Sequence, residues 1–198
     1  MTTGSTLISR VRSNILESTA NQRTDAEILQ WLNEGQLVYL QALGSEAFEE
    51  LFTTTYKASS QLSLPTDYLL FHDLTVRHTV TGTYTETCSA FMVKPSELHI
   101  QQVWAGNLGA WCYIQGGVIK AAPQVFAMTL SYVKSPSMST SASTFQMREE
   151  HEPPIVAYAS HMACLKINDA DADKWLGIFT TVIQARTGKA LGKDVAEA

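Results

Sequence analysis

The spacing of apolar residues changes twice along this chain of 198 residues. Near the N-terminus they recur at helical spacing, as at Leu7, Val11 and Ile15, and helical spacing returns in the C-terminal third. Between these regions, apolar and polar residues alternate with the period of two that is typical of strands. Because helices and strands are segregated along the chain, the pattern predicts an α+β fold. We expect mainly an α-helical bundle, with a central small antiparallel β-sheet or sandwich inserted in it.

The bundle is expected to consist of an N-terminal helix pair and a C-terminal helical hairpin. The second helix begins with a capping box, in which the Thr24 hydroxyl accepts from the Glu27 amide and the Glu27 side chain reaches back to Thr24. The third begins near Pro153 and Pro154, because the first amides of a helix need no partner. The predicted helices span about residues 5–18, 24–45, 153–168 and 171–187.

The β-rich insert is expected over about residues 56–135, with four to six strands. Alternation predicts one strand from Tyr56 to Leu64 and another over residues 82–93. The clearest local signal is the pair Gly116-Gly117, which lies between two strand-like arms and supplies the positive φ of a tight hairpin turn. A short helix is expected after Pro95.

We expect the helices and the insert to form a single domain over residues 1–187. The remaining residues, 188–198, read GKALGKDVAEA and are mostly small or polar. Glycine is a poor helix former, and the segment contains few apolar residues that could hold it against a core. The sequence therefore predicts a flexible C-terminal tail.

Charge and composition narrow the function classes. The net charge is −5, from 14 basic and 19 acidic residues, and the only local basic cluster is Arg10 with Arg12, which we interpret as a solvated helix face. Proteins that grip nucleic acid gather basic residues on one surface, so this balance argues against such a function. The chain has no apolar run of the ~20 residues that span a bilayer. The absence of a secretory signal pattern and the sparse cysteines favour a cytosolic compartment.

The stretch EEHEPPIVAYASHMACLKINDADADKW is rich in residue types that bind metals. A calcium loop that started at Asp169 would need glycine at its sixth position and glutamate at its twelfth. Those positions hold Lys174 and Thr180, so the calcium interpretation fails. The aspartates are better explained as residues of a helix N-terminus, where they favour the positive end of the helix dipole.

His161 and Cys164 are three residues apart and therefore share one helix face. A zinc site needs a third and usually a fourth ligand, and no neighbouring motif supplies them. The chain also lacks a nucleophile elbow and a phosphate-binding loop. We therefore predict no catalytic residue, no metal and no cofactor. A metal- or thiol-dependent enzyme that uses His161 and Cys164 remains the alternative.

The order of the predicted pieces resembles a known family. A helix pair, LISRVRSNILESTANQRTDAEILQWLNEGQLVYLQAL, precedes LSLPTDYLLFHDLTV, and the hairpin YIQGGVIKAAP, the strand MTLSYVKSPSMS and a closing helical hairpin follow. This layout resembles the head-to-tail adaptor, or head-completion, proteins of tailed bacteriophages, over roughly residues 5–187. The resemblance implies a structural role in the virion neck without enzymatic activity. It also implies a ring, usually twelvefold, which extends the DNA channel between the portal and a stopper or tail protein.

Two sets of site residues follow. The apolar stripe of the second helix is wider than one packing face needs, which predicts subunit contacts through Trp31, Leu32, Val38 and Tyr39. The resemblance implies that the tail docks on the portal, with Leu191, Lys193 and Val195 as contacts. DNA would pass through the lumen without sequence-specific binding, no membrane would be involved, and assembly would take place in the host cytoplasm.

A further alternative comes from the aromatic residues of the strand region. Trp104, Trp111 and Tyr113 would suit a sugar-binding module if they were exposed, and ordinary sheet packing also accounts for them. Another phage tail-completion protein is the remaining structural alternative.

Overall fold

The computed structural model describes residues 2–17, 22–81, 84–97, 110–122, 125–167 and 169–188. The chain divides into two compact units. The helical unit comprises Met1–Leu51 and Ser135–Ala198, and the insert unit comprises Phe52–Lys134. The boundaries of the insert unit lie close to those expected from the change in hydrophobic period, and the predicted α+β fold class is confirmed.

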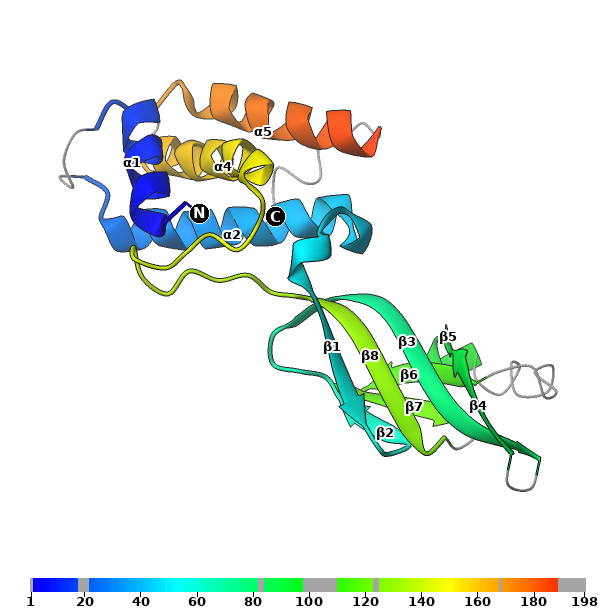
Figure 1. Cartoon of the computed structure of the whole chain (residues 1–198). Helices are drawn as coiled ribbons and strands as arrows, with labels where there is room; N and C mark the ends of the chain where they lie inside the picture. Colours follow the sequence, from blue (N-terminus) through cyan, green and yellow to red (C-terminus); the bar gives the residue numbers. More distant parts are fainter. Residues whose placement is uncertain are drawn as a thin grey trace. The chain divides into compact units, whose positions relative to one another are not determined.

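Four α-helices build the described part of the helical unit: α1 (Gly4–Asn14), α2 (Asp25–Leu43), α4 (Glu152–Leu165) and α5 (Ala172–Thr187). Helix α4 lies between α2 and α5 and also contacts α1 (Figure 1). This central position explains why α4 is buried on most of its surface. Helices α2 and α4 approach closely at Gly35, where an added Cβ atom would lie 2.9 Å from Cδ1 of Tyr158.

The ends of the helices follow the local signals in the sequence. The predicted capping box is present: the Glu27 amide donates to the Thr24 hydroxyl (3.2 Å), and the Thr24 amide donates to the Glu27 carboxylate (2.9 Å). Pro153 and Pro154 occupy the first turn of α4, as predicted. Gly188 ends α5 with a φ of 64°, a left-handed conformation that glycine adopts without strain.

Eight strands form two four-stranded sheets in the described part of the insert unit, more than the four to six that we predicted. The first sheet has the spatial order β1 (Phe52–Lys57), β8 (Ala127–Lys134), β3 (Tyr68–Thr81) and β4 (Tyr84–Ser89). The second has the order β2 (Gln61–Ser63), β7 (Val118–Ala122), β6 (Trp111–Gln115) and β5 (Phe91–Met92). All pairings are antiparallel except the short parallel contact between β5 and β6 (Figure 1).

Two predicted strands are each divided between the sheets. The prediction of one continuous strand from Tyr56 to Leu64 is wrong, because a bend at residues 58–60 separates β1 from β2. The strand expected over residues 82–93 likewise contains both β4 and β5. Alternation continues through such corners because both sheets turn one face toward the same core, so the period alone does not mark the bend.

The core of the insert unit combines side chains of both sheets, including Leu74 and Leu130 from the first and Cys112 and Ile119 from the second. The Gly116-Gly117 hairpin is confirmed: both residues have positive φ, 59° and 73°, and they connect β6 to β7. Only Pro95–Glu97 of the predicted short helix is described, and these residues form a 3-10 turn.

Candidate functional surfaces

The predicted contact residues of α2 fall into two pairs. Leu32 and Tyr39 are fully buried in the core of the helical unit. Trp31 and Val38 are only partly buried, and because they are seven residues apart they lie on the same side of the helix. The part of the predicted interface that a second subunit can reach in this fold is therefore Trp31 with Val38.

The predicted docking residues of the tail, Leu191, Lys193 and Val195, lie outside the described residues. Helix α5 ends at Gly188, whose amide donates to the Gln184 carbonyl oxygen (2.9 Å). A polar pocket lies beside this helix end.

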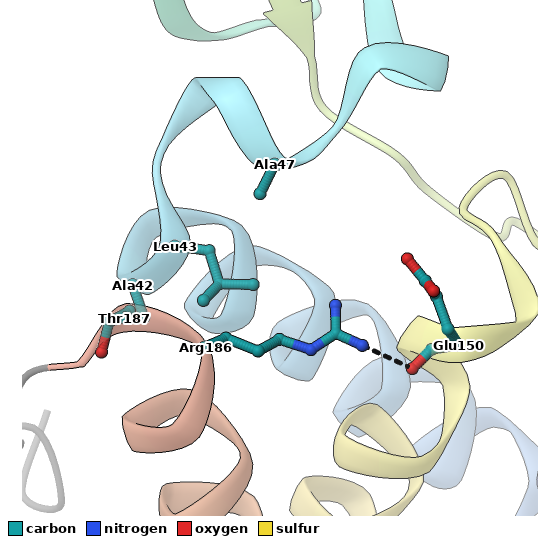
Figure 2. Close-up of a pocket in the computed structure, with 6 residues that line it drawn as sticks. All are labelled: Ala42, Leu43, Ala47, Glu150, Arg186 and Thr187. Atoms are coloured by element: carbon teal, nitrogen blue, oxygen red, sulfur yellow. Dashed lines mark hydrogen bonds between the residues drawn. The ribbon is translucent and has the colours of Figure 1, made fainter.

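This pocket has a volume of about 570 Å³ and lies where α2 and α5 end and α4 begins (Figure 2). Figure 2 shows the Arg186 side chain extending from α5 toward Glu150, and its Nη2 donates to the Glu150 carbonyl oxygen (3.2 Å). The six lining residues are Ala42, Leu43, Ala47, Glu150, Arg186 and Thr187.

Arg186 also fixes the protonation of a buried histidine. Its Nη1 lies 3.0 Å from Nδ1 of His151, and because arginine can only donate, this nitrogen must accept. The proton of the neutral ring is then on Nε2, which lies 3.5 Å from a Glu150 carboxylate oxygen and 3.7 Å from one of Glu50. Burial and then the Arg186 charge lower the pKa of His151, although the two carboxylates oppose this change. Burial and the Arg186 contact therefore favour the neutral form of His151 in the folded protein.

This histidine predicts a dependence of stability on pH. The pKa of His151 is lower in the folded than in the unfolded chain, so its stabilising effect is present above the unfolded value of 6.5 and is lost as the pH falls. We expect the free energy of unfolding to fall by up to about 1.4 kcal/mol per pH unit below 6.5 from this group. His151→Phe should lose this dependence, whereas His72→Phe, at an exposed position, should keep it. Urea unfolding at pH 7.5 and 5.5 measures how much the free energy of unfolding changes with pH. An equal change in His151→Phe and in the unmodified protein would contradict the assignment to His151.

A second buried polar cluster joins α1 and α2 to the end of α4. The Arg23 side chain is 2% exposed, its Nε donates to the Ala163 carbonyl oxygen (2.8 Å), and its Nη1 donates to Glu17 (3.2 Å). Arg12 donates to the Arg23 carbonyl oxygen and to Asp25. Arg10 forms an ion pair with Glu152, whose side chain is buried. The interpretation of Arg10 and Arg12 as a solvated face is therefore wrong for Arg12, whose side chain is 12% exposed, whereas Arg10 is 50% exposed and remains solvated while it pairs with Glu152.

His161 and Cys164 are both buried within the helical unit, where they have structural roles. The His161 Nδ1–H donates to the Ala172 carbonyl oxygen (2.9 Å), which ties α4 to the first residue of α5. Cys164 is 1% exposed, and burial raises the pKa of its thiol, which disfavours the reactive thiolate. In the part of the chain that the structure describes, no three His, Cys, Asp or Glu side chains are grouped as metal ligands would be.

The two described aromatic residues considered for sugar binding, Trp111 and Tyr113, lie two residues apart on β6 and therefore share one face of the strand. The Trp111 ring packs on Phe91 with 5.1 Å between ring centroids, and Tyr113 is partly buried in the same strand. Trp104 lies outside the described residues. The contact with Phe91 thus accounts for Trp111 by packing within the second sheet.

None of the helices in the described ranges combines the length and apolar character that a membrane span requires. A search of curated proteins finds no match to this chain. A family model described as "SU10 adaptor protein" matches residues 2–196, which is nearly the whole chain and includes both units. The match agrees with the resemblance that the order of helices and strands indicates. The chain belongs to the SU10 adaptor family, and its role is that of a structural adaptor protein of a bacteriophage.

Proposed function

We propose that this chain is a neck protein that assembles as a twelvefold ring under the portal and joins the DNA-filled head to the stopper or tail. It has no enzymatic activity in this proposal, and it extends the channel through which DNA passes. The observation that carries the proposal is the family match over residues 2–196, because it covers the helical unit and the insert unit together. The protein is made in the host cytoplasm and is located in the virion neck.

A ring requires two different complementary surfaces on each subunit. Trp31 and Val38 of α2 supply part of one surface, since these large apolar side chains keep accessible area on one side of the helix. Their neighbours Leu32 and Tyr39 hold the same helix in the core of its own subunit. The helix is thereby fixed in an orientation that presents the first pair outward.

The charge balance supports a channel function. With a net charge of −5 the protein has little tendency to bind the phosphate backbone of DNA. A lumen that carries few basic residues lets DNA slide through without sequence-specific binding.

The C-terminal tail is the proposed contact with the portal. Leu191 and Val195 are its apolar anchors, and burying both stabilises the contact by about 3–5 kcal/mol before the cost of ordering the segment, so a single tail binds weakly. A ring presents many tails to one portal at the same time, so the combined attachment is far stronger than that of a single tail. Lys193 lies between the anchors and adds a charge that an acidic portal surface would attract.

Truncation after Thr187 tests this function. Helix α5 ends at Thr187, so the shortened chain keeps every helix of the described structure and should keep its fold and its stability. We expect the truncated protein to join heads to tails at least about tenfold less well than the full chain, because the multivalent attachment is lost. The measurement is the yield of infectious particles when purified protein is added to filled heads that lack it. Leu191→Ser with Val195→Ser should reproduce most of the loss, whereas Ala196→Ser should not. A normal yield with the truncated protein would contradict the docking role of the tail.

A further inference from the structure

The first sheet of the insert unit ends in two strands of equal length. Among the described residues its order is β1-β8-β3-β4, so β1 and β4 are the end strands of the described sheet, and each contains six residues. The second sheet ends in β2 and β5, which have only three and two residues. Very short end strands are a usual protection against pairing with another chain. The first sheet lacks this protection.

The direction of the strands allows the sheet to continue into a second copy. Each neighbouring pair in the first sheet is antiparallel, so the directions alternate from β1 through β8 and β3 to β4. With four strands, the two end strands run in opposite directions. When a second copy is placed beside the first in the same order, its β1 is antiparallel to β4 of the first, and the alternation is unbroken.

We propose that β4 of one subunit pairs with β1 of the next, so that the first sheet continues from subunit to subunit. This inference rests on the proposed ring and identifies a second subunit contact in it, distinct from Trp31 and Val38 on α2. The contact joins two different strands and is therefore heterologous, which is the kind of interface that closes a ring.

The core-facing sides of β4 in one subunit and β1 in the next match when the two six-residue strands are paired over their full length. In that register Thr55 lies opposite Glu86, and Thr53 lies opposite Cys88. Thr53 and Thr55 pair with Tyr132 and Leu130 of β8, which belong to the core of the insert unit. Cys88 pairs with Val76 of β3, which belongs to the same core. Core-facing positions of one strand thus meet core-facing positions of the other, whereas a shift by one residue would place them on opposite faces.

The charges and residue types of the two strands also agree with this pairing. Lys57 at the end of β1 and Glu86 of β4 are both exposed, and in the same register they are diagonal neighbours of opposite charge. The rest of β1, Phe52 to Tyr56, has no charge and no proline and consists of residues that favour strands. Its Tyr56 is 67% exposed, and a neighbouring strand would cover part of its ring.

A disulfide between subunits tests the pairing. The double variant Thr55→Cys with Glu86→Cys places two thiols opposite each other across the contact, and diamide oxidises them to one disulfide. Denaturing gels should then show a ladder of linked chains that extends beyond dimers, because each chain bonds to a different neighbour on either side. Thr54→Cys with Glu86→Cys is the matched control. Its thiols lie on opposite faces, so we expect about tenfold less cross-linking. Each single cysteine variant measures the background from the native cysteines.

The outcomes separate this inference from the proposed ring. A ring by mass without a ladder would overturn the β1–β4 pairing and leave the ring standing. A ladder that stops at dimers would also overturn it, because it would indicate a symmetric contact. If the unmodified chain forms no ring, even with portal present, both the proposed ring and the β1–β4 pairing are contradicted. If the double variant fails to fold, as judged by circular dichroism, charge reversal provides the second test. Lys57→Glu and Glu86→Lys should each weaken assembly about two- to fivefold, and the two together should restore it.

Discussion

Arg23→Ala is expected to lower the free energy of unfolding by about 3–4 kcal/mol, because it removes one partner of a buried ion pair. Arg23 is the residue that links the segment between α1 and α2 to the end of α4. Without it, the Ala163 carbonyl oxygen loses its donor. The Glu17 carboxylate, which is 10% exposed, loses its nearest cation.

The electrostatics of Glu17 show how much depends on this contact. Burial opposes ionisation of Glu17, but hydrogen bonds from the Gln22 amide and from Arg23 outweigh that effect and hold its pKa below the ordinary value. In Arg23→Ala the pKa of Glu17 should therefore rise. Chemical denaturation measures the stability. Arg148→Ala is the matched control, because Arg148 is 56% exposed and pairs with carboxylates at the surface. Its loss should cost less than about 1 kcal/mol. Equal losses in the two variants would contradict the structural role of Arg23.

A charge at the outward side of α2 is expected to block assembly. Trp31→Glu or Val38→Glu would place an unpaired carboxylate in the proposed subunit contact, at a cost of about 3–5 kcal/mol. This corresponds to a loss of association of roughly a hundredfold or more. Both positions are only partly buried within the chain, so the fold itself should be retained.

The control for this prediction lies on the same helix. Ala26 is exposed and lies well away from the Trp31–Val38 side around the helix, so Ala26→Glu adds the same charge outside the proposed contact. Light scattering should give a ring for Ala26→Glu and a much smaller mass for the other two variants, with unchanged circular dichroism in all three. Rings of normal mass from both Trp31→Glu and Val38→Glu would show that this side of α2 is not an interface.

The parts of the fold that sequence analysis predicted are those with local causes. The capping box at Thr24 and Glu27 depends on residues three apart, and the hairpin at Gly116-Gly117 depends on the φ values that two adjacent glycines adopt. The change of hydrophobic period also lies near the boundaries of the insert unit, Phe52 and Lys134, within what the sequence predicts to be one domain. The corner at residues 58–60 was not, since alternation on both sides of the bend serves one core.

The contacts that sequence analysis missed join residues that are far apart in the chain. Arg23 and Ala163 are 140 positions apart, and His151 and Arg186 are 35 apart. No local pattern distinguishes Arg23 from an arginine on a solvated face. For the same reason the wide stripe of α2 could not be divided in advance into Leu32 and Tyr39, which face the core, and Trp31 and Val38, which do not.

The central claim is that the chain forms a ring that binds a portal, and the mass of the assembly tests it most directly. Multi-angle light scattering of the full chain, alone and mixed with purified portal, should give with portal a complex heavier than the portal by about twelve chains of 21.8 kDa. A chain that stays monomeric in the presence of portal, with no change in the portal's mass, would contradict it.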